Sequence, residues 1–118
     1  MLGWTLVRVS GGSMAPLLRD GDYVAARTFG PTRRPSDGDI VLVDHPRLGL
    51  IVKRVCETAT DGRYRLEGLA PESTDSVALG WMPRDCLIAR ARWRIGPAGV
   101  SRLARPRPST RGRGAPGP

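Results

Sequence analysis

Apolar and polar residues alternate with a period of two along much of the chain, and this pattern is typical of β-strands. Glycine-containing turns separate the segments, and no convincing amphipathic helical pattern is present, although WMPRD is compatible with one helical turn. Six strands are expected, at residues 5–9, 22–29, 39–45, 50–58, 63–68 and 85–95. The pattern predicts an all-β domain of about six strands, built as a small coiled or barrel-like sheet.

Three of these segments carry more detailed predictions. The run IVLV within 39–45 is apolar at every position, which indicates a strand buried on both faces. ATDG, between 50–58 and 63–68, is typical of a hairpin turn. In 85–95, residues 87, 89, 91, 93 and 95 form one side, and Arg90, Arg92 and Arg94 form the other. We therefore expect a half-exposed strand whose arginines face solvent.

Charge divides the chain into two parts. At 118 residues the sequence has room for one domain, and its formal net charge is +8. Residues 97–118 contain five arginines and no acid, so subtracting them leaves +3 for the rest. We expect the β domain to span 1–96 and residues 97–118 to form a disordered basic tail. Such a tail is suited to weak contact with acidic surfaces, rather than to specific nucleic-acid binding.

The location and the cofactor chemistry follow from what the sequence lacks. No apolar run approaches the roughly 20 residues that span a bilayer, and the first ten residues do not resemble a signal peptide, so a cytoplasmic protein is expected. Cys56 and Cys86 are separated too widely for a metal motif, and we expect both to be reduced. His45 is the single histidine and lies at a strand-to-turn junction, where a surface or capping role is expected. No metal or cofactor is predicted.

Lysine occurs once in this chain. Of nineteen Lys and Arg residues, eighteen are arginine and one is Lys53. Guanidinium keeps its proton at any relevant pH, whereas a buried amine is able to lose its proton. By alternation Lys53 lies on the side of Ile51 and Val55, opposite Arg54, so we expect the lysine to face inward. A chance surface lysine is the alternative.

A partner for this amine lies near the start of the chain. Ser13 stands in VSGGSMAPLLRDGD, between two expected strands, on a glycine-flanked turn. A neutral amine that takes the proton from a serine hydroxyl forms a Ser/Lys dyad, in which lysine replaces the usual histidine. A histidine-based triad is disfavoured because His45 lies in a turn.

The order of four segments carries a family resemblance. GGSMAPLLRDGD, GDIVLVDHP, IVKRV and STDS follow one another within residues 9–90. They resemble the signal peptidase I family of Ser/Lys endopeptidases, with its Ser-Met-x-Pro, Gly-Asp-Ile-Val, Lys-Arg-Val and Ser-x-Asp-Ser segments. Within it, the chain is similar to the short nickel-type superoxide dismutase maturation proteases. The resemblance implies Ser13 as nucleophile, Lys53 as general base and a leader-bearing precursor protein as substrate.

The resemblance also implies supporting residues. Ser73 matches a serine that orients the lysine amine, and Asp75 matches a structural acid in the same loop. Met14 matches a residue whose backbone shapes the substrate cleft, and Pro16 matches the proline that fixes the turn after the nucleophile. The chain departs from the family pattern at Val77, where an arginine usually follows the Ser-x-Asp-Ser segment.

Three other functions remain open at this point. A self-cleaving repressor-type Ser/Lys domain shares the Ser-Met and Lys elements, but a DNA-binding domain and a cleavage loop would have to fit into the twelve residues before Ser13. A small basic β-barrel that binds nucleic acid would use the arginines, although aromatic residues are few. A catalytically degenerate family member is the third alternative, because the segment around 68–77 is altered.

Overall fold

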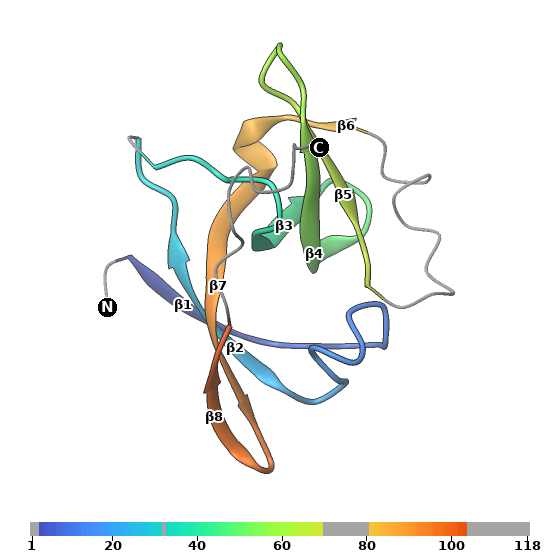
Figure 1. The fold of residues 1–118 in the computed structure, drawn as a ribbon, viewed down its shortest axis with the longest axis vertical. Helices are drawn as coiled ribbons and strands as arrows, with labels where there is room; N and C mark the ends of the chain where they lie inside the picture. Colours follow the sequence, from blue (N-terminus) through green and yellow to red (C-terminus); the bar gives the residue numbers. More distant parts are fainter. Residues whose placement is uncertain (1–2, 32, 70–80, 104–118) are drawn as a thin grey trace, which may run out of the picture.

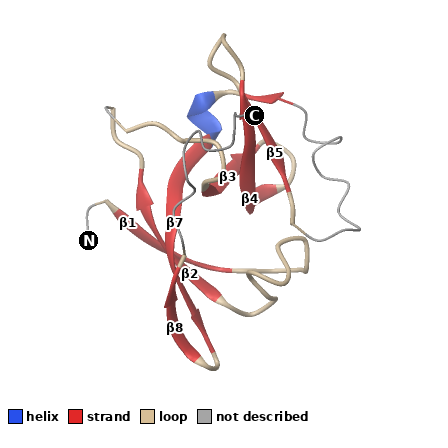
Figure 2. Ribbon diagram, in the orientation of Figure 1, coloured by secondary structure: helices blue, strands red, loops and turns tan. Residues whose placement is uncertain are grey.

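The computed structural model describes residues 3–31, 33–69 and 81–103, which form a twisted sheet with almost no helix (Figures 1 and 2). The elements are β1 (Trp4–Arg8), β2 (Tyr23–Thr28), β3 (Ile40–His45), β4 (Gly49–Thr58), β5 (Tyr64–Glu67), β6 (Trp81–Met82), the 3₁₀ segment η1 (Arg84–Cys86), β7 (Leu87–Gly96) and β8 (Gly99–Arg102). Within these ranges, no helix is long and apolar enough to cross a bilayer.

The sheet is antiparallel and open. Its strand order is β1-β2-β7-β3-β4-β5-β6, and β8 pairs with the end of β7. β7 is the long central strand: its first half pairs with β3 and its second half with β8, while β2 runs along its other edge. β1 and β6 stand at the two ends of this order and do not pair with each other. The predicted all-β fold is confirmed.

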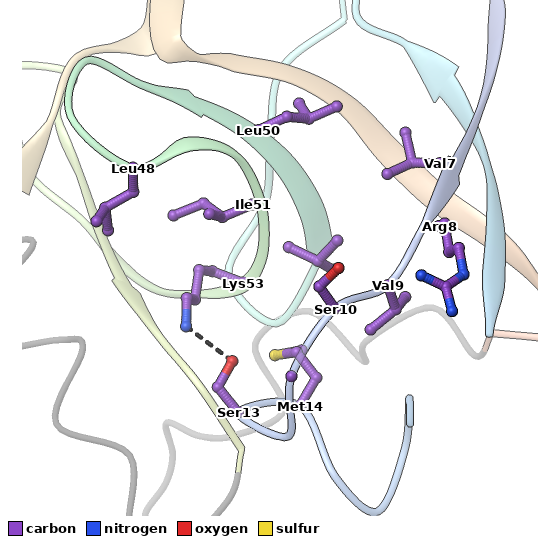
Figure 3. Close-up of a pocket in the computed structure, with 12 residues that line it drawn as sticks. Val7, Arg8, Val9, Ser10, Ser13, Met14, Leu48, Leu50, Ile51 and Lys53 are labelled. Carbon is purple, nitrogen blue, oxygen red and sulfur yellow. Dashed lines mark hydrogen bonds between the residues drawn. The ribbon is translucent and has the colours of Figure 1, made fainter. Parts of the chain in front are cut away.

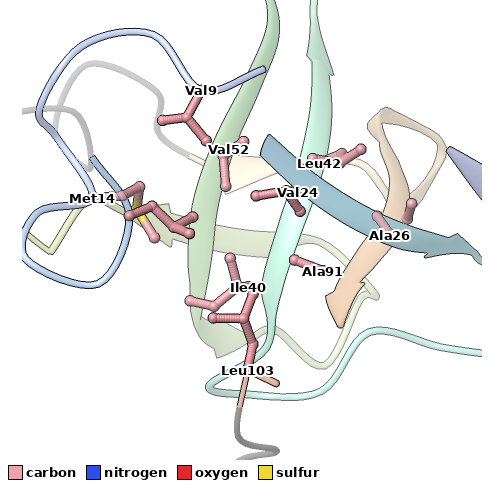
Figure 4. Close-up of a cluster of buried hydrophobic side chains, with 11 residues drawn as sticks. Val9, Met14, Val24, Ala26, Ile40, Leu42, Val52, Ala91 and Leu103 are labelled. Carbon is pink, nitrogen blue, oxygen red and sulfur yellow. The ribbon is translucent and has the colours of Figure 1, made fainter. Parts of the chain in front are cut away.

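The core lies on both faces of the central strands. Ile40 and Leu42 of β3 point into a first core cluster (Figure 4), and Val41 and Val43 point into a second. All four side chains are buried, which confirms the prediction of a strand covered on both faces. The first core cluster consists of Val9, Met14, Leu18, Val24, Ala26, Ile40, Leu42, Val52, Ala89, Ala91 and Leu103. The second consists of Val41, Val43, Val55, Tyr64, Leu66, Met82 and Leu87.

The six expected strands are present, and the ATDG hairpin is confirmed. The Ala59 N–H donates to the Arg63 carbonyl at 2.8 Å, and Gly62 takes the positive φ of 90° that the turn requires. The two-residue strand β6 was not expected, because it is too short to show an alternating pattern. The turn expected in WMPRD is present as η1.

β8 moves the end of the ordered domain beyond the expected boundary. The prediction began the tail at residue 97, but Gly96 pairs with Gly99, and residues 97 and 98 form a tight turn between β7 and β8. Leu103 is buried in the first core cluster. Proline and glycine here mark a hairpin rather than a linker. The remainder of the expected tail, residues 104–118, lies outside the described residues.

The expected alternation in β7 is interrupted twice. Val43 is opposite Leu87 and Leu42 is opposite Ala89, so an irregularity at Ile88 places Leu87 in the second core cluster and Ala89 in the first. Ala26 is opposite Ala91 and Ala25 is opposite Trp93, so Arg92 is an extra residue in a β-bulge. The bulge reverses the faces, and Trp93 is exposed rather than on the buried side. The prediction of a solvent-facing arginine row is wrong for Arg90, which is largely buried and lies 3.7 Å from the Asp39 carboxylate.

Candidate active site

Ser13 lies in the loop between β1 and β2, and this loop is held in place by its own backbone. The Val9 N–H donates to the Asp22 carbonyl at 2.7 Å, and the Gly21 N–H donates to the Val9 carbonyl at 2.8 Å, so the two ends of the loop are tied together. The Met14 side chain, next to Ser13, is buried in the first core cluster. The nucleophile candidate is therefore fixed on one side by the core.

A contact from another part of the chain holds Ser13 from the opposite side. The Leu69 N–H, just after β5, donates to the Ser13 carbonyl at 2.7 Å. Within the loop, the Ala15 N–H donates to the Gly12 carbonyl at 3.1 Å, and the Ala15–Pro16 peptide bond is cis. The two hydrogen bonds fix the backbone around Ser13.

Lys53 lies in the middle of β4 and is 4% exposed. Val41 of β3 is its cross-strand partner, and Ile51 and Val55 share its face of the strand. The neighbouring Arg54 instead points outward, where its side chain is 42% exposed and forms an ion pair with Glu67. The prediction that the lysine and not the arginine faces inward is confirmed.

The two side chains meet. The Lys53 Nζ donates a hydrogen bond to the Ser13 Oγ over 2.9 Å (Figure 3). Burial removes alternative positions for the long lysine side chain, and the anchored loop fixes the hydroxyl. A hydroxyl in contact with an amine is the arrangement from which a serine nucleophile is activated.

A cavity of about 460 Å³ opens beside this pair. Its walls come mainly from the end of β1 with the following loop and from the first half of β4, as Figure 3 shows. Its lining residues are Val7, Arg8, Val9, Ser10, Gly11, Ser13, Met14, Leu48, Leu50, Ile51, Val52 and Lys53. The lining thus combines aliphatic side chains with the polar side chains of Arg8, Ser10, Ser13 and Lys53.

Both walls present strand edges. Among the described strands, β1 is the last on its side of the sheet and pairs with β2 alone. β4 pairs with β5 from Arg54 onward, so its stretch before Arg54 has β3 as its single neighbour among the described strands. Unpaired backbone N–H and C=O groups along a strand edge are able to bind another extended chain.

The other predicted residues fall in different places. The Met14 side chain fills the core and also lines the cavity, and Pro16 is exposed in the loop after Ser13. Ser73 and Asp75 lie outside the described residues.

His45 is a capping residue, as expected, but it is buried rather than on the surface. Its Nδ1 accepts hydrogen bonds from the Arg47 and Leu48 N–H groups, each at 3.1 Å, and so closes the β3–β4 turn. Cys56 and Cys86 are both free. Burial raises the pKa of both thiols, and the neighbouring Glu67 raises that of Cys56 further. Low thiol reactivity follows.

Sequence reasoning missed two leucines of the cavity wall, Leu48 just before β4 and Leu50 in β4, which together we call the β4 wall. Leu48 and Leu50 are 55% and 48% exposed, although both are large aliphatic side chains. The sequence does contain a signal for them, because two leucines flank the turn glycine Gly49 close to the single lysine. Large aliphatic residues are unusual in an exposed turn that has no binding role.

The comparison with family models decides the class of protein. A model described as Peptidase S24-like matches residues 3–79, which include Ser13, Lys53 and the whole cavity wall. The chain belongs to the Peptidase S24-like family. Membership supports a serine-peptidase type of function, and the predicted serine peptidase is confirmed at that level. Searches of curated proteins and of solved structures returned no significant match.

Proposed function

We propose that this Peptidase S24-like protein is a serine endopeptidase in which Ser13 is the nucleophile and Lys53 the general base. The observation that supports this most directly is the 2.9 Å contact between the Lys53 Nζ and the Ser13 Oγ at the wall of a cavity. Contact distance between nucleophile and base is the geometric requirement for this chemistry.

The first half of the reaction forms an acyl-enzyme. Lys53 takes the Ser13 hydroxyl proton while Oγ attacks the scissile carbonyl carbon, and an oxyanion forms. The intermediate collapses as the C–N bond breaks, and the Lys53 ammonium gives its proton to the leaving amine. An ester between Ser13 and the acyl part of the substrate remains.

The second half returns the enzyme to its starting state. Lys53 takes a proton from a water molecule, whose oxygen attacks the ester carbonyl. The C–Oγ bond then breaks, the proton passes to the Ser13 Oγ, and a carboxylic acid leaves.

The oxyanion would be stabilised by backbone donors next to the nucleophile. The Ser13 N–H makes no hydrogen bond within the described part of the chain, so it is available for this role. One such donor typically contributes about 2.7–4 kcal/mol to transition-state stabilisation. From the family resemblance, we propose that Ser73 orients the Lys53 amine and that Asp75 supports the same loop.

The substrate is proposed to bind as an extended peptide between the edges of β1 and β4. Main-chain hydrogen bonds to both edges would place its scissile carbonyl above Ser13, and the leucines of the β4 wall would contact apolar side chains. The motif resemblance leads us to propose removal of a leader from a precursor, with nickel superoxide dismutase precursor as the specific candidate.

Incubation of purified protein with that precursor, read by mass spectrometry, tests the proposal. One cut that releases the leader is expected, with no cut by the Ser13→Ala variant. Cleavage that survives in Ser13→Ala would disprove the nucleophile assignment. Cleavage of other extended peptides but not of the precursor would retain the dyad and reject the substrate. A folded protein that cleaves neither would point to the degenerate alternative.

A further inference from the structure

β1, β2, β7 and β8 share an outward face on the side of the sheet away from the first core cluster. Directly opposed residues of antiparallel strands lie on the same face, so the strand register identifies its members. Two rows cross the four strands: Leu6, Ala25, Trp93 and Arg102 in one, and Arg8, Tyr23, Ile95 and Val100 in the next. We call these eight residues the outer face.

The outer face is unusually apolar for a surface. Leu6 is 60% exposed and Val100 is 65% exposed, and Tyr23 and Trp93 are also exposed. The register brings these side chains together from strands that are far apart in the sequence. Scattered exposed apolar residues are ordinary, but a contiguous group on one sheet face marks an interaction site.

The charge of the same strands specifies the partner. Three arginines of these strands, Arg8, Arg27 and Arg102, lie on or beside the outer face, and none of the four strands contains Asp or Glu. On the outer face Arg102 stacks on the Trp93 ring at 5.6 Å, and beside it Arg27 stacks on the Trp4 ring at the same distance. A second copy docking face to face would oppose arginine with arginine. The partner that complements this face is anionic.

The β7–β8 hairpin indicates how the outer face would meet its partner. It projects from the sheet (Figure 1), and residues 95–101 are uncharged, with Arg94 before them and Arg102 after them. The uncharged tip, with its exposed aliphatic residues, suits the boundary between the headgroups and the acyl chains. The arginine and tryptophan side chains nearer the sheet suit the headgroup layer. A nucleic acid would use the arginines and the aromatic rings, but it would leave the aliphatic side chains of Leu6 and Val100 without a suitable contact.

We propose that the outer face docks on an anionic lipid surface, with the tip of the β7–β8 hairpin inserted among the headgroups. The contact is peripheral, and it stands independently of the proposed peptidase activity.

Sedimentation of the full chain with lipid vesicles tests this. Binding to phosphatidylcholine vesicles containing phosphatidylglycerol is expected to exceed binding to pure phosphatidylcholine. The double variant Leu6→Ser/Val100→Ser should weaken that binding by about tenfold or more, because binding strength scales with buried apolar area. The matched control is Leu48→Ser/Leu50→Ser, which removes exposed leucines of the cavity wall and should bind as wild type does. Circular dichroism checks that both variants are folded.

Two results would overturn the proposal. Vesicle binding that is unchanged in Leu6→Ser/Val100→Ser would show attraction by arginine charge alone. Tighter binding to a single-stranded oligonucleotide than to anionic vesicles, lost in Trp93→Ala, would assign the face to nucleic acid. A second readout is quenching of tryptophan fluorescence by brominated lipid, which the double variant Trp4→Phe/Trp93→Phe should largely remove and Trp81→Phe, on β6, should leave in place.

Discussion

The Lys53 Nζ lies 2.9 Å from the Ser13 Oγ, although forty positions separate the two residues, Ser13 in the β1–β2 loop and Lys53 on β4. Two contacts create this proximity: Leu69 binds the Ser13 carbonyl, and Met14 anchors the loop in the core. Both contacts act on the backbone around the serine rather than on its hydroxyl. The hydroxyl therefore remains directed at the amine and at the cavity.

Replacement of the base should separate catalysis from folding. In Lys53→Arg the guanidinium retains its proton, and in Lys53→Met the proton acceptor is absent, so both variants should lose about 10²–10⁴-fold in kcat/KM. Lys53→Met should remain as stable as wild type or become more stable, since it replaces a buried amine with an apolar side chain of similar length. Peptide cleavage and thermal unfolding measure the two effects.

Arg54→Gln is the control for the two Lys53 variants. It removes the neighbouring positive charge on the outward side of β4 and should leave kcat/KM within a few-fold of wild type. If Lys53→Arg retained wild-type activity, lysine would not be the base.

The packing of Met14, which anchors the β1–β2 loop in the core, should contribute measurably to the free energy of unfolding. Met14→Ala removes a fully buried side chain next to Ser13 and should lower the free energy of unfolding by about 2–5 kcal/mol. Met14→Leu preserves volume and should cost less than about 1.5 kcal/mol. Chemical denaturation measures both. Equal stability of Met14→Ala and wild type would mean that the core does not hold the loop.

The strands and the contact between Ser13 and Lys53 could be predicted because their signals are local. Period-two alternation identified β2 to β4, and the apolar run in β3 correctly gave burial on both faces. One lysine among eighteen arginines singled out Lys53, and alternation gave its direction. A glycine-flanked serine ahead of a proline gave Ser13.

The bulge in β7, the β7–β8 hairpin and the strand edges at the cavity could not be predicted, because the pattern of apolar and polar residues does not determine strand pairing. The bulge at Arg92 shifts β7 by one residue, and no composition signal distinguishes a bulged strand from a regular one. Gly96 and Gly99 look like linker residues until their pairing is known. The exposed edges that line the cavity arise from which strands pair, and pairing is a property of the whole sheet.

Charge on the β4 wall should affect substrate binding. Leu48→Asp and Leu50→Asp introduce carboxylates into the apolar side of the cavity and should raise KM for an extended apolar peptide about tenfold or more, with little change in kcat. Leu6→Asp, on an equally exposed leucine outside the cavity, is the control and should leave KM unchanged. A rise in KM for the control alone would place the peptide on the outer face instead.

The Arg54–Glu67 pair, on the outward side of β4 beside Lys53, should make stability depend on acid. Burial acts to raise the pKa of Glu67, but the hydrogen bond and positive charge of Arg54 outweigh it, and the net pKa is lowered. A carboxyl whose pKa is depressed in the folded state stabilises the fold above its unfolded pKa of about 4.3, and this contribution is lost as the pH falls through the folded value.

Glu67→Gln should therefore unfold at a lower temperature than wild type at pH 7, and the difference should shrink as the pH falls below about 4.3. Because both side chains are partly exposed, the difference at pH 7 should not exceed about 1 kcal/mol. Thermal unfolding from pH 7 down to pH 3 measures it, and Glu57→Gln, which removes a more exposed partner of Arg65, is the comparison. A gap between wild type and Glu67→Gln that stayed constant through the acid range would show that the carboxyl contributes through packing and not through its charge.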